Sequence, residues 1–181
     1  MSDDSELAVI RRAQNGDARA FEALVDEYQG VLYNLALRMT GNPEDARDLT
    51  QTVFLKVWRN LASYDPRHRF YSWVYRITLN ESLNFVQRRR PHSELDERMP
   101  DTSAGPDDDA SANETNTQIQ GALMELTAEY REVIVLRHFH QLAYQEIAEI
   151  LSIPEKTVKS RLYSARQLLG ERLRQRGITS A

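Results

Sequence analysis

The sequence predicts an all-α protein of two small helical domains joined by an acidic, flexible linker. Apolar residues recur at helical spacing on both sides of a central segment, and no alternating run is long enough for a convincing strand. The central segment is rich in Pro, Asp, Ser and Ala and nearly free of aliphatic side chains, so burial cannot offset the entropy of ordering it. These observations divide the chain into residues 1–91, 92–117 and 118–181.

The first domain is predicted to contain four helices, bounded by residues that begin or end helices. Ser5 can cap a short helix that ends at 15–16, and Asp17 can cap a longer one that stops before Pro43. Pro43 suits the first position of the third helix. The fourth is expected over 69–90. The inward stripe of the second helix is Phe21, Leu24, Val25, Tyr28, Leu32, Leu35 and Met39.

The second domain is predicted to end in a helix-turn-helix. Thr127 can cap a preceding helix, and the stretch 144–169 has a short helix, a tight break at 152–154 and a longer second helix. Such a unit lays its second helix in the major groove of DNA, with its N-terminal residues at base edges. The residues expected to face outward there are Glu155, Lys156, Lys159, Ser160, Tyr163 and Arg166. The alternative is an ordinary helical hairpin, against which the basic residues beside a short break argue.

The charge distribution leaves room for DNA binding although the chain carries a net charge of −4. The three segments carry net charges of +1, −7 and +2, so almost all the acidity lies in the linker. The acidic N-terminus and the lack of a long apolar run predict neither a signal peptide nor a membrane span, and we expect a cytoplasmic protein.

Two further stretches carry more aromatic side chains than one buried face needs. Phe54 and Trp58 lie off the inward stripe of the third helix and form either a patch for a protein partner or contacts under a neighbouring helix. The helix over 69–90 combines aromatic rings, Asn80 and Asn84 with terminal arginines, a set suited to stacking on unpaired bases and holding phosphates. The alternative is that some of these aromatic side chains belong to the core.

No catalytic centre is recognisable in the sequence. The chain lacks cysteine, which excludes disulfides, Cys-based zinc sites and thiol nucleophiles. His138 and His140 are expected on different sides of a helix, and the run of aspartates at 107–109 is typical of a solvated linker. We therefore expect no enzyme activity, cofactor, metal or small-molecule substrate.

Four stretches, in this order, resemble the extracytoplasmic-function (group IV) sigma factors of bacterial RNA polymerase. They are NGDARAFEALVDEYQGVLY, DLTQTVFLKVW, FYSWVYRITLNESLNFVQRRRP and LTAEYREVIVLRHFHQLAYQEIAEILSIPEKTVKSRLYSARQLL. The resemblance implies a sigma-2-like helical bundle and a sigma-4-like helix-turn-helix domain. It also implies that the protein directs core RNA polymerase to promoters by recognising duplex −35 DNA and opened −10 DNA, and that an anti-sigma factor restrains it.

The resemblance also assigns residues to three surfaces. Docking on the β′ coiled coil of the polymerase is expected from Asp48, Gln51, Thr52, Phe54, Lys56 and Trp58. The −10 element is expected to contact Tyr64, Arg67, Arg69, Phe70, Tyr71, Trp73, Tyr75, Asn80, Asn84, Arg88 and Arg89. The −35 element is expected to contact Glu155, Lys156, Thr157, Lys159, Ser160, Arg161, Tyr163 and Arg166. The β flap of the polymerase is expected as a further partner.

Three positions depart from the family pattern. Thr52 stands where an acidic residue is usual, which weakens the docking assignment slightly. Ala143 stands where a serine cap is frequent, at a cost of roughly 1 kcal/mol. Ser164 replaces a frequent arginine and removes one phosphate contact, which leaves Arg161 and Arg166 to compensate.

Two rival functions remain open on the sequence alone, a stand-alone helix-turn-helix repressor and a nucleic-acid enzyme. A repressor should bind duplex DNA alone, usually as a dimer on a palindrome, whereas a sigma factor should need polymerase. As a relaxed coil the linker spans only ~30 Å. We therefore expect the two domains of the free protein to pack or tumble close together, which could cover one DNA face until polymerase separates them.

Overall fold

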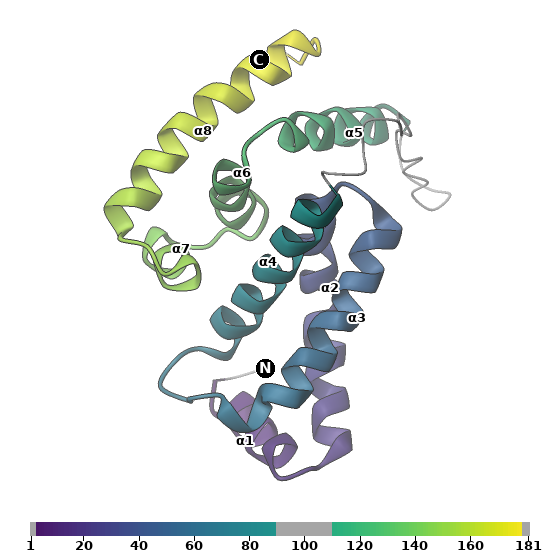
Figure 1. The fold of residues 1–181 in the computed structure, drawn as a ribbon, viewed down its shortest axis with the longest axis vertical. Coiled ribbons are helices and arrows are strands. Elements are labelled where there is room, and N and C mark those ends of the chain that lie inside the picture. The colour runs from purple at the N-terminus through teal and green to yellow at the C-terminus, as the bar shows by residue number, and fades with distance from the viewer. Residues whose placement is uncertain (1–2, 90–109, 179–181) are drawn as a thin grey trace.

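The computed structural model describes residues 3–89 and 110–178, and within these ranges the regular structure is helical (Figure 1). No helix in the described ranges is both long and apolar enough to cross a membrane. The elements are α1 (Asp3–Gln14), α2 (Ala18–Thr40), α3 (Pro43–Asn60), η1 (Leu61–Ser63), α4 (Phe70–Arg89), α5 (Ala110–Met124), α6 (Ala128–Ile134), η3 (Val135–Phe139), α7 (Tyr144–Leu151) and α8 (Glu155–Gln175).

The N-terminal bundle is formed by α1 to α4, with α2 packed against the other three. Its helix caps agree with the sequence prediction. The side chain of Asp17 accepts hydrogen bonds from the backbone N–H groups of Arg19 and Ala20, and Pro43 begins α3 behind the capping side chain of Asn42. Gly41 ends α2 with a φ of 75°, a conformation that glycine adopts without steric cost.

Two sequence predictions need correction. Helix α1 already includes Ser5, because it begins at Asp3, so Ser5 is not its N-cap. Residues 110–117, assigned to the linker, form the start of α5. The side chain of Arg38 donates hydrogen bonds to Gln120 and Asn116, at 3.0 and 2.7 Å, so contacts with α2 hold a segment that has few aliphatic residues. Residues 92–109 of the predicted linker lie outside the described residues.

The C-terminal part consists of α5 to α8, with α8 packed against α5, α6 and α7. A π-helical turn, η3, continues α6 and is marked by a hydrogen bond from the His140 N–H to the Val135 carbonyl at 3.2 Å. His138 and His140 then face different neighbours, as expected. The Nε2 of His138 accepts a hydrogen bond from Arg166, whereas the Nδ1 of His140 lies 2.9 Å from the hydroxyl of Tyr75.

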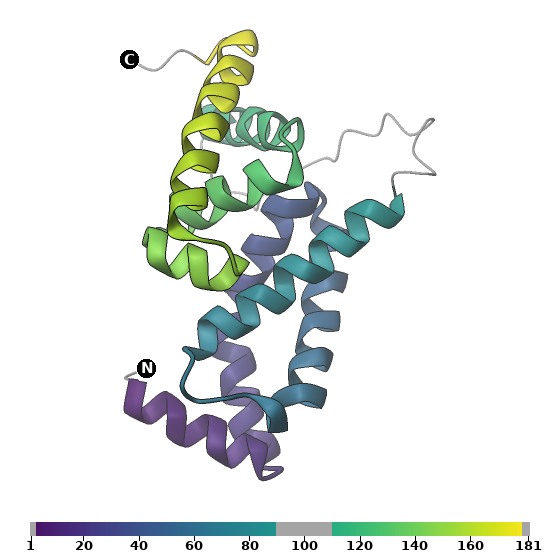
Figure 2. The same cartoon turned by 60° about the vertical axis from the view of Figure 1, so that its left-hand side comes forward.

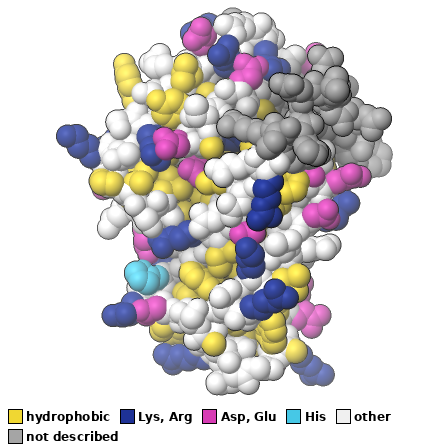
Figure 3. All heavy atoms as spheres, viewed as in Figure 1, with side chains coloured by type: hydrophobic (Ala, Val, Ile, Leu, Met, Phe, Trp, Pro, Cys, Tyr) yellow, Lys and Arg dark blue, Asp and Glu magenta, His cyan; other side chains and the backbone are white. Residues whose placement is uncertain are grey.

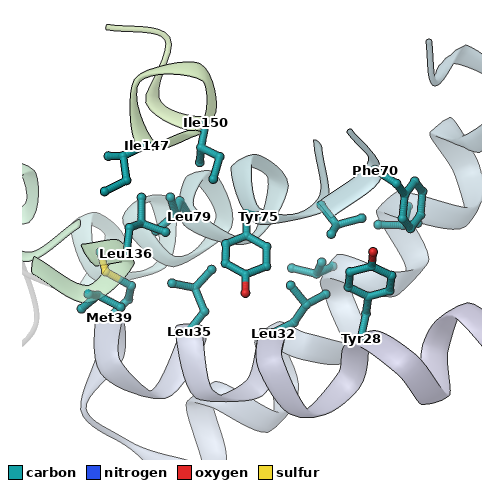
Figure 4. Close-up of a cluster of buried hydrophobic side chains, with 14 of the residues drawn as sticks. Tyr28, Leu32, Leu35, Met39, Phe70, Tyr75, Leu79, Leu136, Ile147 and Ile150 are labelled. Carbon is teal, nitrogen blue, oxygen red and sulfur yellow. The ribbon is translucent and has the colours of Figure 1, made fainter. Parts of the chain in front are cut away.

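One continuous hydrophobic core joins the two parts of the molecule. In the close-up of Figure 4, Leu79 of α4 faces Ile147 and Ile150 of α7, and Met39 of α2 lies beside Leu136 of η3. The turned view of Figure 2 shows α7 next to α4, and the two helices are in contact. The expectation that the two domains lie close together is therefore met by direct packing.

A buried arginine ties the N-terminal bundle to the C-terminal part. Arg131 is 4% exposed, and its guanidinium donates hydrogen bonds to four backbone carbonyls. The Met39 carbonyl, at 2.7 Å, belongs to the last turn of α2, and the Leu123 and Met124 carbonyls, both at 2.9 Å, belong to the last turn of α5. Leu126 supplies the fourth, at 3.0 Å. Because helix C-termini carry partial negative charge, this position suits a buried cation.

Replacing Arg131 by methionine should lower the free energy of unfolding by at least about 3 kcal/mol, because four backbone carbonyls, three of them in buried hydrogen bonds, lose their donors. Urea unfolding followed by circular dichroism measures this change. The matched control is Arg172→Ala, which removes a partly exposed bridge to Glu125 at 3.1 Å and should cost less than about 1 kcal/mol. Equal losses in the two variants would contradict the role given to Arg131.

Candidate nucleic-acid interface

The N-terminal half of α8 presents an exposed polar face, which we call the α8 face: Lys156, Lys159, Ser160, Tyr163 and Arg166. Tyr163 is 69% exposed. Val158, Leu162 and Ala165 point the other way and are buried, as the sequence predicted. The helix-turn-helix geometry is therefore present, with Ser152 in the left-handed conformation at the break (φ 54°).

Some of the predicted α8 residues already have partners. Lys159 forms an ion pair with Glu155 at 2.6 Å, and this carboxylate raises the pKa of the Lys159 ammonium. Arg161 is only partly exposed and pairs with Glu129 at 3.2 Å. Thr157 is partly buried, and its carbonyl accepts a hydrogen bond from the Ser160 hydroxyl. Lys156 and Tyr163 are therefore better placed to meet a ligand than Thr157 and Arg161.

The start of α7 lacks half of its cap. Ala143 stands at the N-cap position with extended backbone (φ −68°, ψ 157°), and it has no side-chain oxygen to accept a hydrogen bond. The reciprocal half is present, since the Ala143 N–H donates to Glu146 Oε2 at 2.7 Å. The free-energy cost predicted for alanine at this position therefore corresponds to one missing hydrogen bond, which a serine side chain would accept from the Glu146 N–H.

A second exposed surface, the α3 aromatic face, is formed by Phe21, Phe54, Leu55 and Trp58. Trp58 is 42% and Leu55 is 57% exposed. The ring of Phe21, from α2, lies 4.7 Å from Trp58 and 6.5 Å from Phe54, centroid to centroid. Both alternatives for Phe54 and Trp58 are thus partly right, since these rings pack on α2 and still leave apolar surface exposed. The sequence predicted Phe21 for the inward stripe of α2 and did not single out Leu55, so neither was expected on this surface.

An adjoining groove of about 540 Å³ runs between α2 and α3. Gln51 and Phe54 line it, together with Val25, Tyr33 and Arg47. Two predicted docking residues, Asp48 and Thr52, are exposed on α3, and the Thr52 hydroxyl donates to the Asp48 carbonyl at 2.9 Å. Lys56 instead points to α4, where its ammonium pairs with Glu81 at 2.5 Å, and it does not line the groove.

Several aromatic residues predicted to contact bases lie in the core. Tyr64, Phe70 and Tyr75 are buried, and Trp73 is partly buried with its ring 5.4 Å from Tyr64 and 5.7 Å from Phe70. The Tyr64 hydroxyl donates to the His68 carbonyl at 2.5 Å, which holds the loop before α4. In this arrangement protein side chains cover these rings, so the core alternative holds for them.

The polar side chains of α4 are divided between solvent and α7. Asn80, Asn84 and Arg88 are exposed, while the side chain of Arg89 lies outside the described residues. Arg67 is exposed in the preceding loop and binds Asp65. Two others, Arg69 and Tyr71, face Glu146 of α7; the Tyr71 hydroxyl donates to its Oε1 at 2.5 Å, and Arg69 lies at 3.7 Å. The Tyr71 hydroxyl, followed by the Ala143 N–H, lowers the pKa of the Glu146 carboxyl.

Asn80 opens on a cavity of about 350 Å³ between α4 and the C-terminal helices. Arg76, Glu132, Ser152 and Arg161 also line it. Burial raises the pKa of Glu132 to about 7, against the opposing effect of Arg161. Asn80 therefore shares this cavity with an acidic and a basic side chain of the C-terminal part, Glu132 and Arg161.

Figure 3 shows one face of the molecule, in the view of Figure 1, on which basic and acidic side chains are interspersed with apolar side chains between them. Sequence reasoning located the cationic side chains that would hold phosphates but not their acidic neighbours. The neighbours come from distant parts of the chain, as Glu146 does for Arg69.

Family models match both parts of the chain. Residues 24–92 match Sigma-70 region 2, and residues 116–169 match Sigma-70 region 4. The first covers α3, α4 and most of α2, and the second covers α6, α7 and most of α5 and α8.

Similar proteins share the full layout. The chain is 33% identical to the ECF RNA polymerase sigma factor SigW of Bacillus subtilis, over 91% of this chain and 95% of that protein. It is 31% identical to the ECF RNA polymerase sigma-E factor of Escherichia coli K12, over 93% and 94%. Among solved structures, CnrH in complex with the cytosolic domain of CnrY is similar with a TM-score of 0.71 and 29% identity, over 93% of this chain and 96% of that one.

Restoring the missing cap should stabilise the helix-turn-helix. Ala143→Ser places a hydroxyl where the N–H of Glu146 can donate to it, and we expect the free energy of unfolding to rise by about 1 kcal/mol. Thermal unfolding measures the change. Ala143→Val, which adds bulk without an acceptor, is the control and should give no gain; a similar rise in both variants would contradict the capping argument.

Proposed function

This chain belongs to the extracytoplasmic-function sigma factors of the sigma-70 family, and from that membership we propose how its surfaces divide the work of promoter recognition. As a member it is a transcription factor without enzymatic activity that directs promoter-specific transcription initiation. Sigma factors bind core RNA polymerase, so the rival of a stand-alone repressor is set aside.

The α8 face reads the −35 element as duplex DNA in this proposal. Lys156, Ser160 and Tyr163 are exposed on the first turns of the second helix of the helix-turn-helix, where base edges are met in such units. Lys159 leaves Glu155 for DNA, and Arg166 supports the complex through phosphate. This exposed polar face over a buried stripe is the observation that carries the assignment.

The solvent side of α4 binds the −10 element as an opened strand. Support comes from Asn80 and Asn84, exposed on one side of a helix that continues to Arg88. Asparagine side chains can hydrogen-bond base edges, and arginines hold phosphates. The rings of Tyr64 and Phe70 are buried, so in this proposal they do not stack on bases. They instead support the loop at 65–69.

The α3 aromatic face and the groove beside it form the docking site for the β′ coiled coil of the polymerase. An apolar surface with an exposed tryptophan, next to a groove lined by polar side chains such as Gln51, has the composition of a protein interface. We assign the β flap to the C-terminal helices. An anti-sigma factor completes the set of partners, supported by the likeness to CnrH, which was solved with the cytosolic domain of CnrY.

The −35 assignment is tested with Lys156→Ala. Duplexes are first selected from a randomised library by the wild-type chain bound to core polymerase, and binding is then measured across a salt series. If Lys156 reads a base, the variant loses roughly 1–3 kcal/mol at one position of the site; if it holds phosphate, the loss is uniform and the salt slope falls by about one. Arg174→Ala, on the exposed far end of the same helix, is the matched control. Unchanged binding by the Lys156 variant would mean that the α8 face is misassigned.

The docking assignment is tested with Trp58→Ala. Truncating an exposed tryptophan of the proposed interface should weaken binding to core polymerase by about 2 kcal/mol, or roughly thirtyfold. Tyr163→Ala, which removes another exposed aromatic side chain, should leave binding to core polymerase intact and reduce −35 recognition. Pull-down with core polymerase and start-site-specific transcription separate the two effects, and loss of polymerase binding in the Tyr163 variant alone would refute the division of surfaces.

A further inference from the structure

The cavity of about 350 Å³ beside Asn80, which we call the four-helix cavity, is lined by side chains of α4, α6, α7 and α8. Its volume lies at the lower end of the range of about 300–1,000 Å³ that is usual for small-molecule sites. One part of its wall is apolar and is formed by Leu79 and Leu83 of α4 with Leu151 of α7. The cavity therefore has room for a small molecule that carries an apolar group.

Glu132 is a buried carboxyl group without a protein partner at this cavity. The residue is only 7% exposed and lines the cavity from α6. Within residues 3–89 and 110–178, no hydrogen bond or ion pair engages its carboxyl group. By contrast, its neighbour Arg131 is bonded to four carbonyls. Because buried charged groups are normally hydrogen-bonded, the Glu132 carboxyl points to a ligand that brings donors, such as an ammonium group.

Arg161 supplies a positive charge to the same cavity from α8. Its guanidinium lies 3.2 Å from Glu129, which is 65% exposed, so solvent weakens this ion pair. In the part of the chain that the structure describes, Arg161 donates no hydrogen bond. A guanidinium fork matches a carboxylate in geometry, and the Ser152 hydroxyl on the same cavity wall adds another donor.

We propose that the four-helix cavity is a binding site for a free aliphatic α-amino acid such as leucine. The ligand's ammonium group donates to Glu132 and to the amide oxygen of Asn80. Its carboxylate accepts hydrogen bonds from Arg161 and Ser152, and its side chain packs on the apolar wall. An α-amino acid carries these three groups on one carbon atom, which suits the small volume of the cavity. The inference does not depend on the proposed DNA and polymerase surfaces.

The charges around Glu132 predict that binding releases a proton. Burial raises the pKa of Glu132 to about 7; Arg161 and Arg131 oppose this rise, and Glu129 adds to it. Near pH 7 the carboxyl group is therefore protonated in a large fraction of the molecules. A bound ammonium group favours the ionised form, so the proton leaves when the ligand binds. Affinity should accordingly increase as the pH rises through 7, because above this pH the carboxyl group is already ionised.

The test is isothermal titration calorimetry of the full chain with L-leucine, L-isoleucine and L-valine. Two analogues of leucine divide the contacts: 4-methylpentanoate lacks the ammonium group, and 3-methylbutylamine lacks the carboxylate. Each analogue should bind about tenfold or more weakly than leucine, because each loses hydrogen bonds to a charged group. Repeating the leucine titration at pH 7 in buffers of different ionisation enthalpy measures the proton release.

Three variants assign the contacts. Glu132→Gln keeps the shape of the side chain; it should weaken leucine binding about tenfold, abolish the proton release and leave 4-methylpentanoate binding undiminished. Arg161→Met should weaken leucine and 4-methylpentanoate but not 3-methylbutylamine. Glu171→Gln, which removes an exposed carboxylate elsewhere on α8, is the matched control and should change none of these values. Circular dichroism reports whether each variant is folded.

The outcomes are distinct. Absence of binding by all three amino acids at millimolar concentration would overturn the proposal and leave the cavity to water. Equal affinity for leucine and 4-methylpentanoate would reveal a site for anions and also overturn it. Proton release that persists in Glu132→Gln would remove the role given to this carboxyl group. None of these results bears on the proposed promoter recognition, which is tested separately.

Discussion

The guanidinium of Arg131 is the contact on which the arrangement of the molecule depends. A buried cation is tolerated only when its donors are satisfied, and the four carbonyls that satisfy it come from α2, from α5 and from the turn after α5. The C-terminal ends of α2 and α5 and the turn after α5 must therefore meet at the Arg131 side chain. Helices α6 and η3 then pack against α2, and the centroid of the Phe139 ring lies 4.4 Å from the guanidinium carbon of Arg38. The position of the C-terminal helices on the bundle is a consequence of that junction.

That position brings α7 onto α4 and explains the unusual composition of α4. A helix at the edge of a bundle needs one apolar stripe, but α4 is covered by α2 and α3 on one side and by α7 on another. Phe70 and Tyr75 fill the side toward α2, while Leu79 meets Ile147. The aromatic excess that suggests a surface for unpaired bases is thus largely the consequence of burial on two sides. Asn80, Asn84 and Arg88 are exposed and left without such an explanation, and the proposed −10 assignment rests on them.

Charge is used differently in the two parts of the protein. The α8 face keeps its cations in solvent or in a weak local contact, as Lys159 does in its exposed ion pair with Glu155. Near α4 the cations face acidic groups from α7, which are fixed by their own helix as well; Glu146 both caps α7 and binds Tyr71. Arg69 and Arg76 are therefore engaged within the fold, whereas Lys156 on the α8 face is open to solvent.

The sequence by itself determined the helical class, most helix boundaries and the inward stripes, because caps such as Asp17 and Pro43 and the apolar period are local properties of the chain. It also determined the family, through motifs that keep their order. Only the tertiary structure decided which polar and aromatic side chains stay free, since periodicity shows that a face is apolar but not what covers it. Lys56 turned to Glu81, and residues 110–117 became helical against Arg38. Each of these outcomes depends on a partner distant in sequence, and that is the information a local pattern lacks.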